Sequence, residues 1–299
     1  GADPARAVPA GVAPPTHVVM CSTVSGVTHA HFSISTMRHC SPCASAHAFA
    51  AFADELAEAA RAVTTKYFRT VIVADVKFDA SPVTIADQET EALIREKIEA
   101  TYPDHGIYGE EYGAVRTNAE FVWVLDPIDG TKSFITGKPM FGTLIGLLHA
   151  GRAVVGVIDM PALHERWIGK SGAATMFNGT PVRTRACPEL ANAWMYVTSP
   201  QMFKGPQVPR FEALRDASRY TLYGGDCEGY GLVASGWADV VCEASMSPYD
   251  YIALVPVVEG AGGTMSDWSG RPLGLEGDGS VLAVGDPALH GQVLEILGS

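Results

Sequence analysis

The stretch Phe121-Val-Trp-Val-Leu-Asp-Pro-Ile-Asp-Gly-Thr131 joins a short apolar run, typical of a buried β-strand, to two carboxylates three residues apart. Carboxylates at the end of a buried strand lose hydration and repel each other, so they need a nearby cation. Their hard oxygen ligands suit Mg²⁺. Because residues 131–135 can begin a helix whose free N–H groups face the same place, the stretch predicts a site for a metal ion and a phosphate. The alternative interpretation is that Asp126 and Asp129 only cap a turn.

Helix-like and strand-like segments alternate around this stretch. Apolar residues three or four apart predict amphipathic helices over residues 49–68 and 85–101. This pattern predicts an α/β (α+β) protein with two lobes, residues 49–188 and 189–299, joined by a seam near residues 185–191. The other predicted elements are strands over residues 121–125, 141–148, 153–158, 165–169, 194–198, 220–223 and 239–243, and helices over residues 211–217, 228–235 and 249–259.

The first part of the chain, residues 1–48, differs from the rest in composition. Ser, Thr, Ala and Pro dominate it, no hydrophobic period persists, and the first 53 residues hold one acid, Asp3, and two arginines. This composition is typical of an organellar transit peptide, and the alternative is a disordered tail. We therefore expect a leader over residues 1–48 and a plastid location, with the cytoplasm as the alternative.

Charge and hydropathy exclude two classes of partner. The 299 residues carry a formal net charge of −12, which disfavours nucleic acid. Gly, Pro or a charged residue interrupts every apolar run before the roughly 20 residues that a membrane-spanning helix needs. The six cysteines stand at irregular positions, which indicates reduced thiols. Cys40 and Cys43 have C-x-x-C spacing but no second pair to complete a zinc site.

Three further motifs, taken with the first stretch, resemble a known family. Gly109-Glu-Glu111, Tyr249-Asp-Tyr-Ile-Ala253 and Glu259-Gly-Ala-Gly-Gly263 match the signatures of the inositol monophosphatase family of Mg²⁺-dependent, lithium-sensitive phosphatases in order and spacing. The resemblance runs from about residue 49 to the C-terminus. It implies a layered α-β-α-β-α sandwich with the site between two lobes, and often a homodimer.

The resemblance also implies a role for each matching position. It makes Thr131, Asp87 and Glu110 catalytic, with Thr131 and Asp87 orienting and deprotonating the attacking water, and the Gly130 and Thr131 amides holding phosphate oxygens. For Asp87 and Asp250 the residues leave a second interpretation open, that of a helix N-cap. The implied ligands of two or three Mg²⁺ ions are Glu110, Asp126, Asp129, Asp250 and the Ile128 carbonyl oxygen.

The segment Tyr223-Gly-Gly-Asp-Cys-Glu-Gly-Tyr-Gly231 resembles the histidinol-phosphate phosphatase branch of the family. Asp226 and Glu243 at the mouth of a phosphate site would attract an ammonium group such as that of L-histidinol phosphate. Asp129 and Asp250 are expected to contact the substrate as well. The alternatives are that Asp226 is a surface turn residue, that the enzyme is an inositol or sugar monophosphatase, or that the chain is a catalytically silent scaffold.

Several other side chains carry weaker expectations. Cys227 and Cys242 are expected to flank the pocket, where they would permit redox sensitivity. Trp123, Trp194 and Trp237 are expected in the core.

Overall fold

The computed structural model describes residues 42–71, 75–76 and 82–298. The chain divides into two units, residues 1–39 and 40–299. The first unit lies outside the described residues, as do most of the predicted leader and Cys40. The described part of the second unit contains two main sheets and a short two-stranded sheet formed by β1 (Asp75–Val76) and β2 (Pro82–Val83).

The larger sheet has eight strands in the order β10-β9-β8-β7-β6-β5-β3-β4. Neighbouring strands are antiparallel except β3 and β5, which are parallel. The strands are β3 (Gly106–Gly109), β4 (Gly113–Val115), β5 (Phe121–Asp129), β6 (Gly142–His149), β7 (Arg152–Met160), β8 (Glu165–Lys170), β9 (Met176–Phe177) and β10 (Thr180–Pro181). The sheet confirms the strands predicted between residues 121 and 169, whereas β3, β4, β9 and β10 lie outside the predicted ranges.

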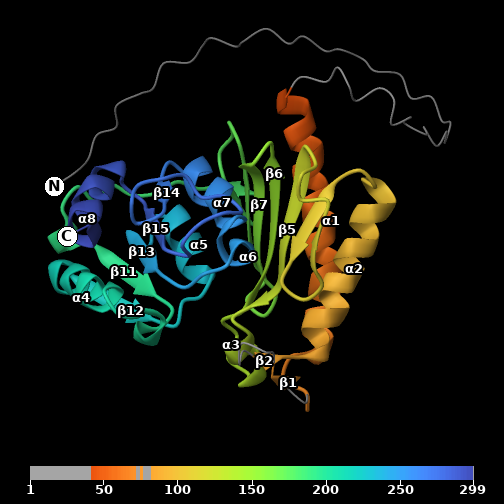
Figure 1. Cartoon of the computed structure of the whole chain (residues 1–299), viewed down its shortest axis with the longest axis horizontal. Helices are drawn as coiled ribbons and strands as arrows, with labels where there is room; N and C mark the ends of the chain where they lie inside the picture. The colour runs from red at the N-terminus through yellow and green to blue at the C-terminus, as the bar shows by residue number, and fades with distance from the viewer. Residues whose placement is uncertain (1–41, 72–74, 77–81, 299) are drawn as a thin grey trace, which may run out of the picture. The chain divides into compact units, whose positions relative to one another are not determined.

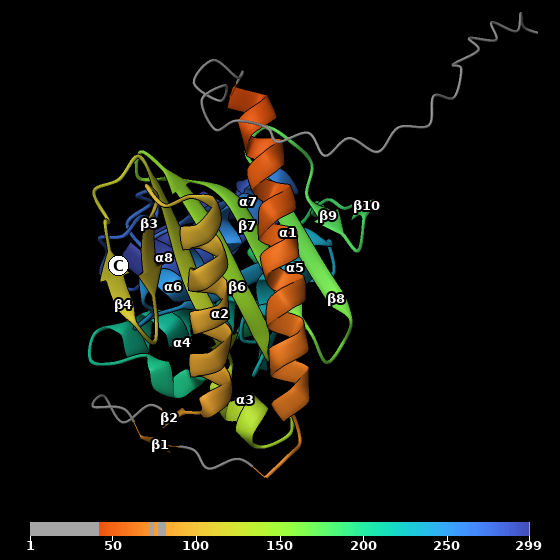
Figure 2. The ribbon, with the colours of Figure 1, turned by 90° about the vertical axis from the view of Figure 1, so that its right-hand side faces the viewer.

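Helices α1 (Pro42–Tyr67) and α2 (Ile85–Thr101) lie side by side on one face of this sheet (Figures 1 and 2). Their apolar side chains form one core cluster with β5, β6 and β7. The bounds of α2 agree with the prediction. Helix α1 begins seven residues before the predicted start, because the preceding segment is rich in alanine, the strongest helix former, and starts at a proline.

Helices α5 (Glu228–Ala234), α6 (Pro248–Tyr251) and α7 (Leu254–Gly260) lie between the two sheets (Figure 1). The helix predicted over residues 249–259 is interrupted between α6 and α7. Pro256 explains the break, since it has no N–H to donate to the Ile252 carbonyl and its ring crowds that carbonyl.

The second sheet has the order β12-β11-β13-β15-β14 and mixed strand directions. Helices α4 (Gln207–Ala217) and α8 (Pro287–Gly298) pack on its outer face, which completes the α-β-α-β-α layers and confirms the expected fold class. Its strands are β11 (Trp194–Val197), β12 (Tyr220–Tyr223), β13 (Val240–Glu243), β14 (Thr264–Ser266) and β15 (Val281–Val284), and short 3₁₀ turns stand at Leu190–Asn192 and Pro200–Met202.

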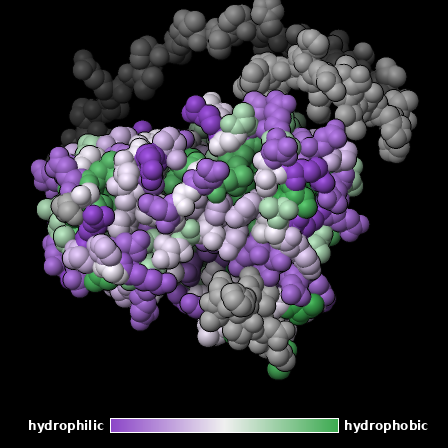
Figure 3. All heavy atoms as spheres, viewed as in Figure 1, coloured by the Kyte–Doolittle hydropathy of each residue, from purple (hydrophilic) through white to green (hydrophobic). Residues whose placement is uncertain are grey.

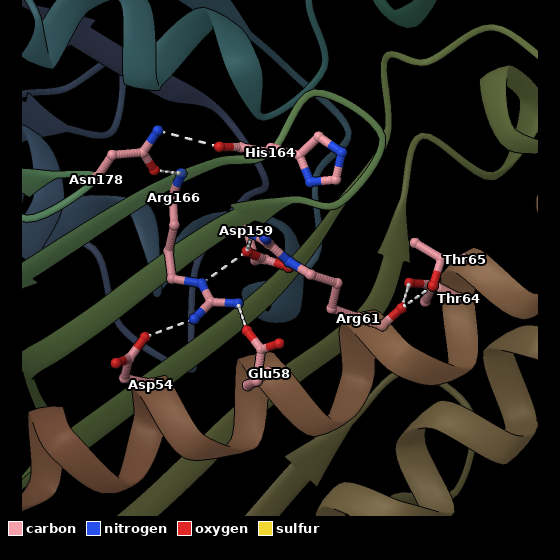
Figure 4. Close-up of polar contacts among 9 residues, drawn as sticks. All are labelled: Asp54, Glu58, Arg61, Thr64, Thr65, Asp159, His164, Arg166 and Asn178. Atoms are coloured by element: carbon pink, nitrogen blue, oxygen red, sulfur yellow. Dashed lines mark hydrogen bonds and ion pairs between the residues drawn. The ribbon is translucent and has the colours of Figure 1, made fainter.

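A cluster of ion pairs joins α1 to β7 and β8 of the eight-stranded sheet (Figure 4). Asp159 on β7 is fully buried and accepts hydrogen bonds from both Arg61 and Arg166. Arg166 also donates to Asp54 at 2.6 Å and to Glu58 at 3.0 Å, both on α1. A cavity of about 430 Å³ beside this cluster includes Arg61 and Arg166 in its lining but none of the predicted site residues.

Two of the three tryptophans predicted in the core are exposed at the surface. Trp123 is fully buried, but Trp194 and Trp237 are 41% and 54% exposed, because both lie at the start of or just before strands of the second sheet rather than within its core. On the face in Figure 3, hydrophilic residues predominate and hydrophobic ones form small separate patches. Among the described helices, none combines the length and the apolar composition that crossing a membrane requires.

Candidate active site

Strand β5 extends four residues beyond its predicted end and carries both carboxylates of the first stretch. Asp126 pairs with Leu144 of β6 and Asp129 pairs with Gly142, so three steps along β5 match two steps along β6. In a regular strand, residues three apart point to opposite faces. The extra residue in β5 is a β-bulge that lets Asp126 and Asp129 turn toward one another.

A third carboxylate, Asp250, arrives from α6. One carboxylate oxygen from each of Asp126, Asp129 and Asp250 lies within 4.8 Å of the others. Oδ2 of Asp250 also accepts a hydrogen bond from the Ser247 N–H at 2.7 Å. Ser247 is therefore the N-cap of α6, and the alternative interpretation of Asp250 as the cap is wrong. Asp250 is the third helical residue of a capping box, a role that coexists with its place in the acidic cluster.

The three carboxylates carry charge that the described side chains do not neutralise: none of them forms an ion pair with a described Lys or Arg. Burial raises the pKa of Asp126 and of Asp129 well above the usual range, and nearby carboxylates raise both further. Burial, with a contribution from Glu110, raises the pKa of Asp250 to about 7. Closely spaced oxygen ligands with this excess negative charge fit a hard divalent cation, so the cluster can bind a metal ion.

Glu110 and Asp87 lie beside this cluster. The Glu110 N–H donates to the Leu125 carbonyl oxygen at 3.2 Å, and its carboxylate raises the pKa of Asp126. Asp87 is 1% exposed, and its Oδ2 accepts hydrogen bonds from the Thr84 N–H at 2.8 Å and hydroxyl at 2.6 Å. The N-cap of α2 is Thr84, so the alternative interpretation of Asp87 as the cap is wrong.

Asp87 also has an unsatisfied oxygen. Its Oδ1 is buried and has no hydrogen-bond partner among the residues that the structure describes. Buried polar atoms are almost always satisfied by protein, water or an ion. The orphaned oxygen therefore fits a bound water or cation that Asp87 shares with the neighbouring carboxylates.

The turn after Asp129 has the geometry expected of a phosphate-binding backbone. Gly130 has a left-handed φ of 80°, and a Cβ there would stand 2.9 Å from the Met140 carbonyl oxygen, so both conformation and space require glycine. Helix α3 (Thr131–Ile135) starts directly after it. The Thr131 hydroxyl donates to the Ile128 carbonyl oxygen at 3.0 Å, which brings the expected catalytic hydroxyl next to an expected metal ligand.

Asp226 comes from the loop before α5 and lies against the same turn. Its Oδ2 accepts a hydrogen bond from the Ser133 hydroxyl at 3.4 Å and would be 3.3 Å from a Cβ on Gly130. The next residue, Cys227, donates its N–H to Asp129 Oδ2 at 2.7 Å. Burial raises the pKa of Asp226, and the charge of Lys138 opposes that shift. Asp226 is therefore a half-buried carboxylate beside the phosphate turn rather than a surface turn residue.

Glu243 lies deeper than a residue at the mouth of a pocket. It is 2% exposed; its Oε1 accepts the Thr198 N–H at 2.9 Å and its Oε2 accepts the Tyr230 hydroxyl at 2.8 Å. A hydrogen bond from the Thr198 side chain in turn lowers the pKa of Asp226, against the effect of burial. Glu243 is therefore held inside the protein by Thr198 and Tyr230, and the expectation that it lies at the mouth of the site is wrong.

The two expected pocket cysteines lie in different places. Cys227 is buried beside the site, with its Sγ 3.6 Å from the Met160 sulfur. Cys242 packs in the core cluster beneath α4 and α8. It precedes Glu243 on β13, and neighbouring residues of a strand point to opposite faces, so the expectation that Cys242 flanks the pocket is wrong.

Two residues that contact the backbone beside the site, Lys138 and Glu91, were not predicted from the sequence. Lys138 donates from Nζ to the Gly224 carbonyl oxygen at 2.8 Å and so joins the α3–β6 loop to the loop of Asp226. Glu91 on α2 is fully buried and binds the backbone beside Glu110. Its position four residues after Asp87, on the same face of the helix, was the available signal.

Comparison with protein families and known proteins shows which family the chain belongs to. The model of the inositol monophosphatase family matches residues 45–299. The chain is 49% identical over 258 residues to the bifunctional phosphatase IMPL2, chloroplastic, of Arabidopsis thaliana, covering 83% of this chain and 75% of that protein. It is 39% identical to a histidinol-phosphatase of Chlorobaculum parvum, covering 77% and 89%. It is 35% identical to a probable inositol 1-monophosphatase of Mycobacterium tuberculosis, covering 70% and 80%.

Solved structures show the same fold. An inositol monophosphatase from Zymomonas mobilis superposes with a TM-score of 0.78 at 43% identity, covering 85% of this chain and 98% of that one. An inositol monophosphatase from Anabaena superposes with a TM-score of 0.74 at 28% identity, covering 84% and 96%.

Proposed function

Since the chain belongs to the inositol monophosphatase family and is a phosphomonoesterase of that family, we propose that it hydrolyses L-histidinol phosphate to L-histidinol and phosphate, as a step of histidine biosynthesis. The observation that carries the choice of substrate is Asp226, a half-buried carboxylate beside the Gly130 turn. A carboxylate at that place offers a partner to the ammonium group of the substrate.

We propose that Glu110, Asp126, Asp129, Asp250 and the Ile128 carbonyl oxygen hold two or three Mg²⁺ ions. The grouped oxygens of three of these carboxylates, their raised pKa values and the orphaned oxygen of Asp87 support this assignment. Bound Mg²⁺ supplies charge that stabilises the phosphate in the transition state and makes the attacking water more acidic.

The chain's own residues then position the reactants. The Gly130 and Thr131 amides hold phosphate oxygens in line with the attacking water. Asp87 and Thr131 orient that water and accept its proton as its oxygen bonds to phosphorus. The ester P–O bond breaks as the new bond forms, and the alcohol leaves with a proton from solvent. Of the proposed substrate contacts, Asp129 and Asp250 would lie next to the phosphate, and buried Glu243 would support the pocket through its contacts with Thr198 and Tyr230.

Phosphate release from histidinol phosphate and from inositol 1-phosphate, with Mg²⁺ and with EDTA, tests the proposal. We expect Mg²⁺-dependent release and a preference for histidinol phosphate. Asp226→Asn should lower kcat/KM for histidinol phosphate by roughly 10- to 100-fold, since a charge-assisted hydrogen bond contributes about 1.5–3 kcal/mol, and should change the value for inositol 1-phosphate little. Asp216→Asn removes an exposed carboxylate of α4 and is the matched control.

Each result has a distinct meaning. Equal losses on both substrates would show that Asp226 is structural. Preference for inositol 1-phosphate would favour the second candidate, an inositol or sugar monophosphatase, which the likeness to inositol monophosphatases from Zymomonas mobilis and Mycobacterium tuberculosis supports. Absence of metal-dependent release from either ester would favour the scaffold. The homodimer, the lobe boundary at residue 188 and the plastid location stay predictions.

A further inference from the structure

The turn that carries Glu110 is fixed by a side chain from another element. Glu91 of α2 is fully buried, and its two carboxylate oxygens bind two successive backbone amides of that turn. Oε2 accepts the Glu111 N–H at 2.7 Å and Oε1 accepts the Tyr112 N–H at 3.1 Å. The turn leads from β3 into β4, so Glu91 holds the connection between these strands.

Arg95, one helical turn after Glu91, completes the arrangement. Its Nε donates to Glu91 Oε1 at 2.7 Å, and a second guanidinium nitrogen donates to the Gly113 carbonyl oxygen at the far end of the turn. The Glu91 side chain is fully buried and the Arg95 side chain is 13% exposed, so this ion pair neutralises a carboxylate that has no contact with solvent. Gly109 leaves the space for this contact, because a Cβ there would overlap the Glu91 carboxylate.

These contacts fix the backbone on both sides of Glu110. Its own N–H donates to the Leu125 carbonyl oxygen on β5, and the next N–H along the chain donates to Glu91. Asp87 lies on the same helix, four residues before Glu91, beside the acidic cluster. Helix α2 therefore sets the positions of two proposed site residues, Asp87 directly and Glu110 through Glu91.

We propose that Glu91, supported by Arg95, is a positioning residue that holds Glu110 in place for a divalent cation. This inference rests on the proposed metal site. A glutamine at position 91 keeps one acceptor but directs an NH₂ group at a backbone N–H that needs an acceptor. The turn then has to move, and Glu110 moves with it. Residues that orient a metal ligand typically change metal affinity by about 10- to 100-fold when they are replaced.

Isothermal titration of Mg²⁺ into the metal-free full chain tests the proposal. Glu91→Gln should weaken Mg²⁺ binding by about 10- to 100-fold. Arg95→Gln should weaken it in the same direction by a smaller factor, because the Glu91 carboxylate and both of its backbone contacts remain. Arg95→Gln also serves as the second variant if Glu91→Gln does not fold, which circular dichroism and Tm report.

Two control variants separate positioning from general stability. Glu99→Gln removes an exposed carboxylate from the same helix, and Arg116→Gln removes its partner, whose Nε also donates to the His105 carbonyl oxygen at the other end of the β3–β4 hairpin. Both should leave Mg²⁺ affinity within about twofold of wild type even where they lower Tm.

The outcomes distinguish this inference from the proposed function. Unchanged Mg²⁺ affinity in folded Glu91→Gln, with binding lost in Asp129→Asn, would overturn the positioning role and leave the metal site intact. Equal weakening by Glu91→Gln and Arg116→Gln would also overturn it, since both would then act through hairpin stability. No Mg²⁺ binding by the wild-type chain would refute the metal site itself.

Discussion

Raising the pH without divalent cations should destabilise the protein through its acidic cluster. In the unfolded chain Asp250 is ionised above about pH 4. In the folded protein, burial and the charge of Glu110 raise its pKa to about 7. Between these values the folded state keeps a proton that the unfolded state has released, so the free energy of unfolding falls as the pH rises from about 4 to about 7. The raised pKa values of Asp126 and Asp129 add to the same trend.

The size of the effect follows from that shift. At about 1.4 kcal/mol per pKa unit, the full shift of Asp250 corresponds to on the order of 4 kcal/mol, of which roughly 3 kcal/mol develops between pH 5 and pH 8. For a domain of this size, that change lowers Tm by about 6–12 °C. His105 acts in the opposite direction, because burial lowers its pKa to about 4. Comparison with Asp250→Asn cancels the His105 contribution, which is common to both proteins, and reports the Asp250 titration together with the effect of its charge on Asp126 and Asp129.

Thermal and urea unfolding of wild type and Asp250→Asn at pH 5, 6, 7 and 8 provides the measurement, in EDTA and in Mg²⁺. Asparagine keeps the acceptor oxygen for the Ser247 N–H, so the start of α6 is preserved. In EDTA, wild type should lose more stability than the variant as the pH rises. Mg²⁺ should stabilise wild type more at pH 8 than at pH 5, because carboxylates bind it when ionised. If the free energy of unfolding in EDTA fell equally with pH in wild type and in Asp250→Asn, the proposed effect of Asp250 would be refuted.

Two further predictions concern groups outside the site. Asp159→Asn should lower the free energy of unfolding by about 3–5 kcal/mol, because it removes the fully buried carboxylate that pairs with both Arg61 and Arg166 and leaves Arg166 with two more exposed partners. Asp54→Asn, at a 49% exposed partner of Arg166, should lower it by under about 1 kcal/mol. Similar losses for the two variants in urea unfolding would contradict this. Half-buried His105 resists protonation and should by itself cost about 1–2 kcal/mol of stability between pH 6.5 and pH 4, so the stability of wild type relative to His105→Phe should fall by that amount over this range.

Regular periodicity was enough to predict the elements that frame the site. Residues 85–101 keep a helical spacing of apolar residues, and α2 has those bounds. Prediction failed where a single residue or a distant contact decides the outcome. Pro256 divides one predicted helix into two. Strand β14 has only three residues, too few to show a period, and it is stabilised by pairing with β15, which in turn pairs with β13.

The chemistry of the site could be inferred from sequence more completely than its geometry, and the reason is energetic. Acids after a buried strand are unfavourable in any fold unless a cation stabilises them, so the sequence made Asp126 and Asp129 candidates for a metal site, with a turn cap as the alternative. Their convergence depends on an extra residue in β5, which alternation alone does not predict. The amide of Cys227, which binds Asp129 from 98 residues away, comes from the loop before α5. Contacts between residues far apart in the sequence do not follow from local spacing, which is why the sequence indicated a cluster of carboxylates but neither the Cys227 amide that binds Asp129 nor the Glu91 carboxylate that binds the turn after Glu110.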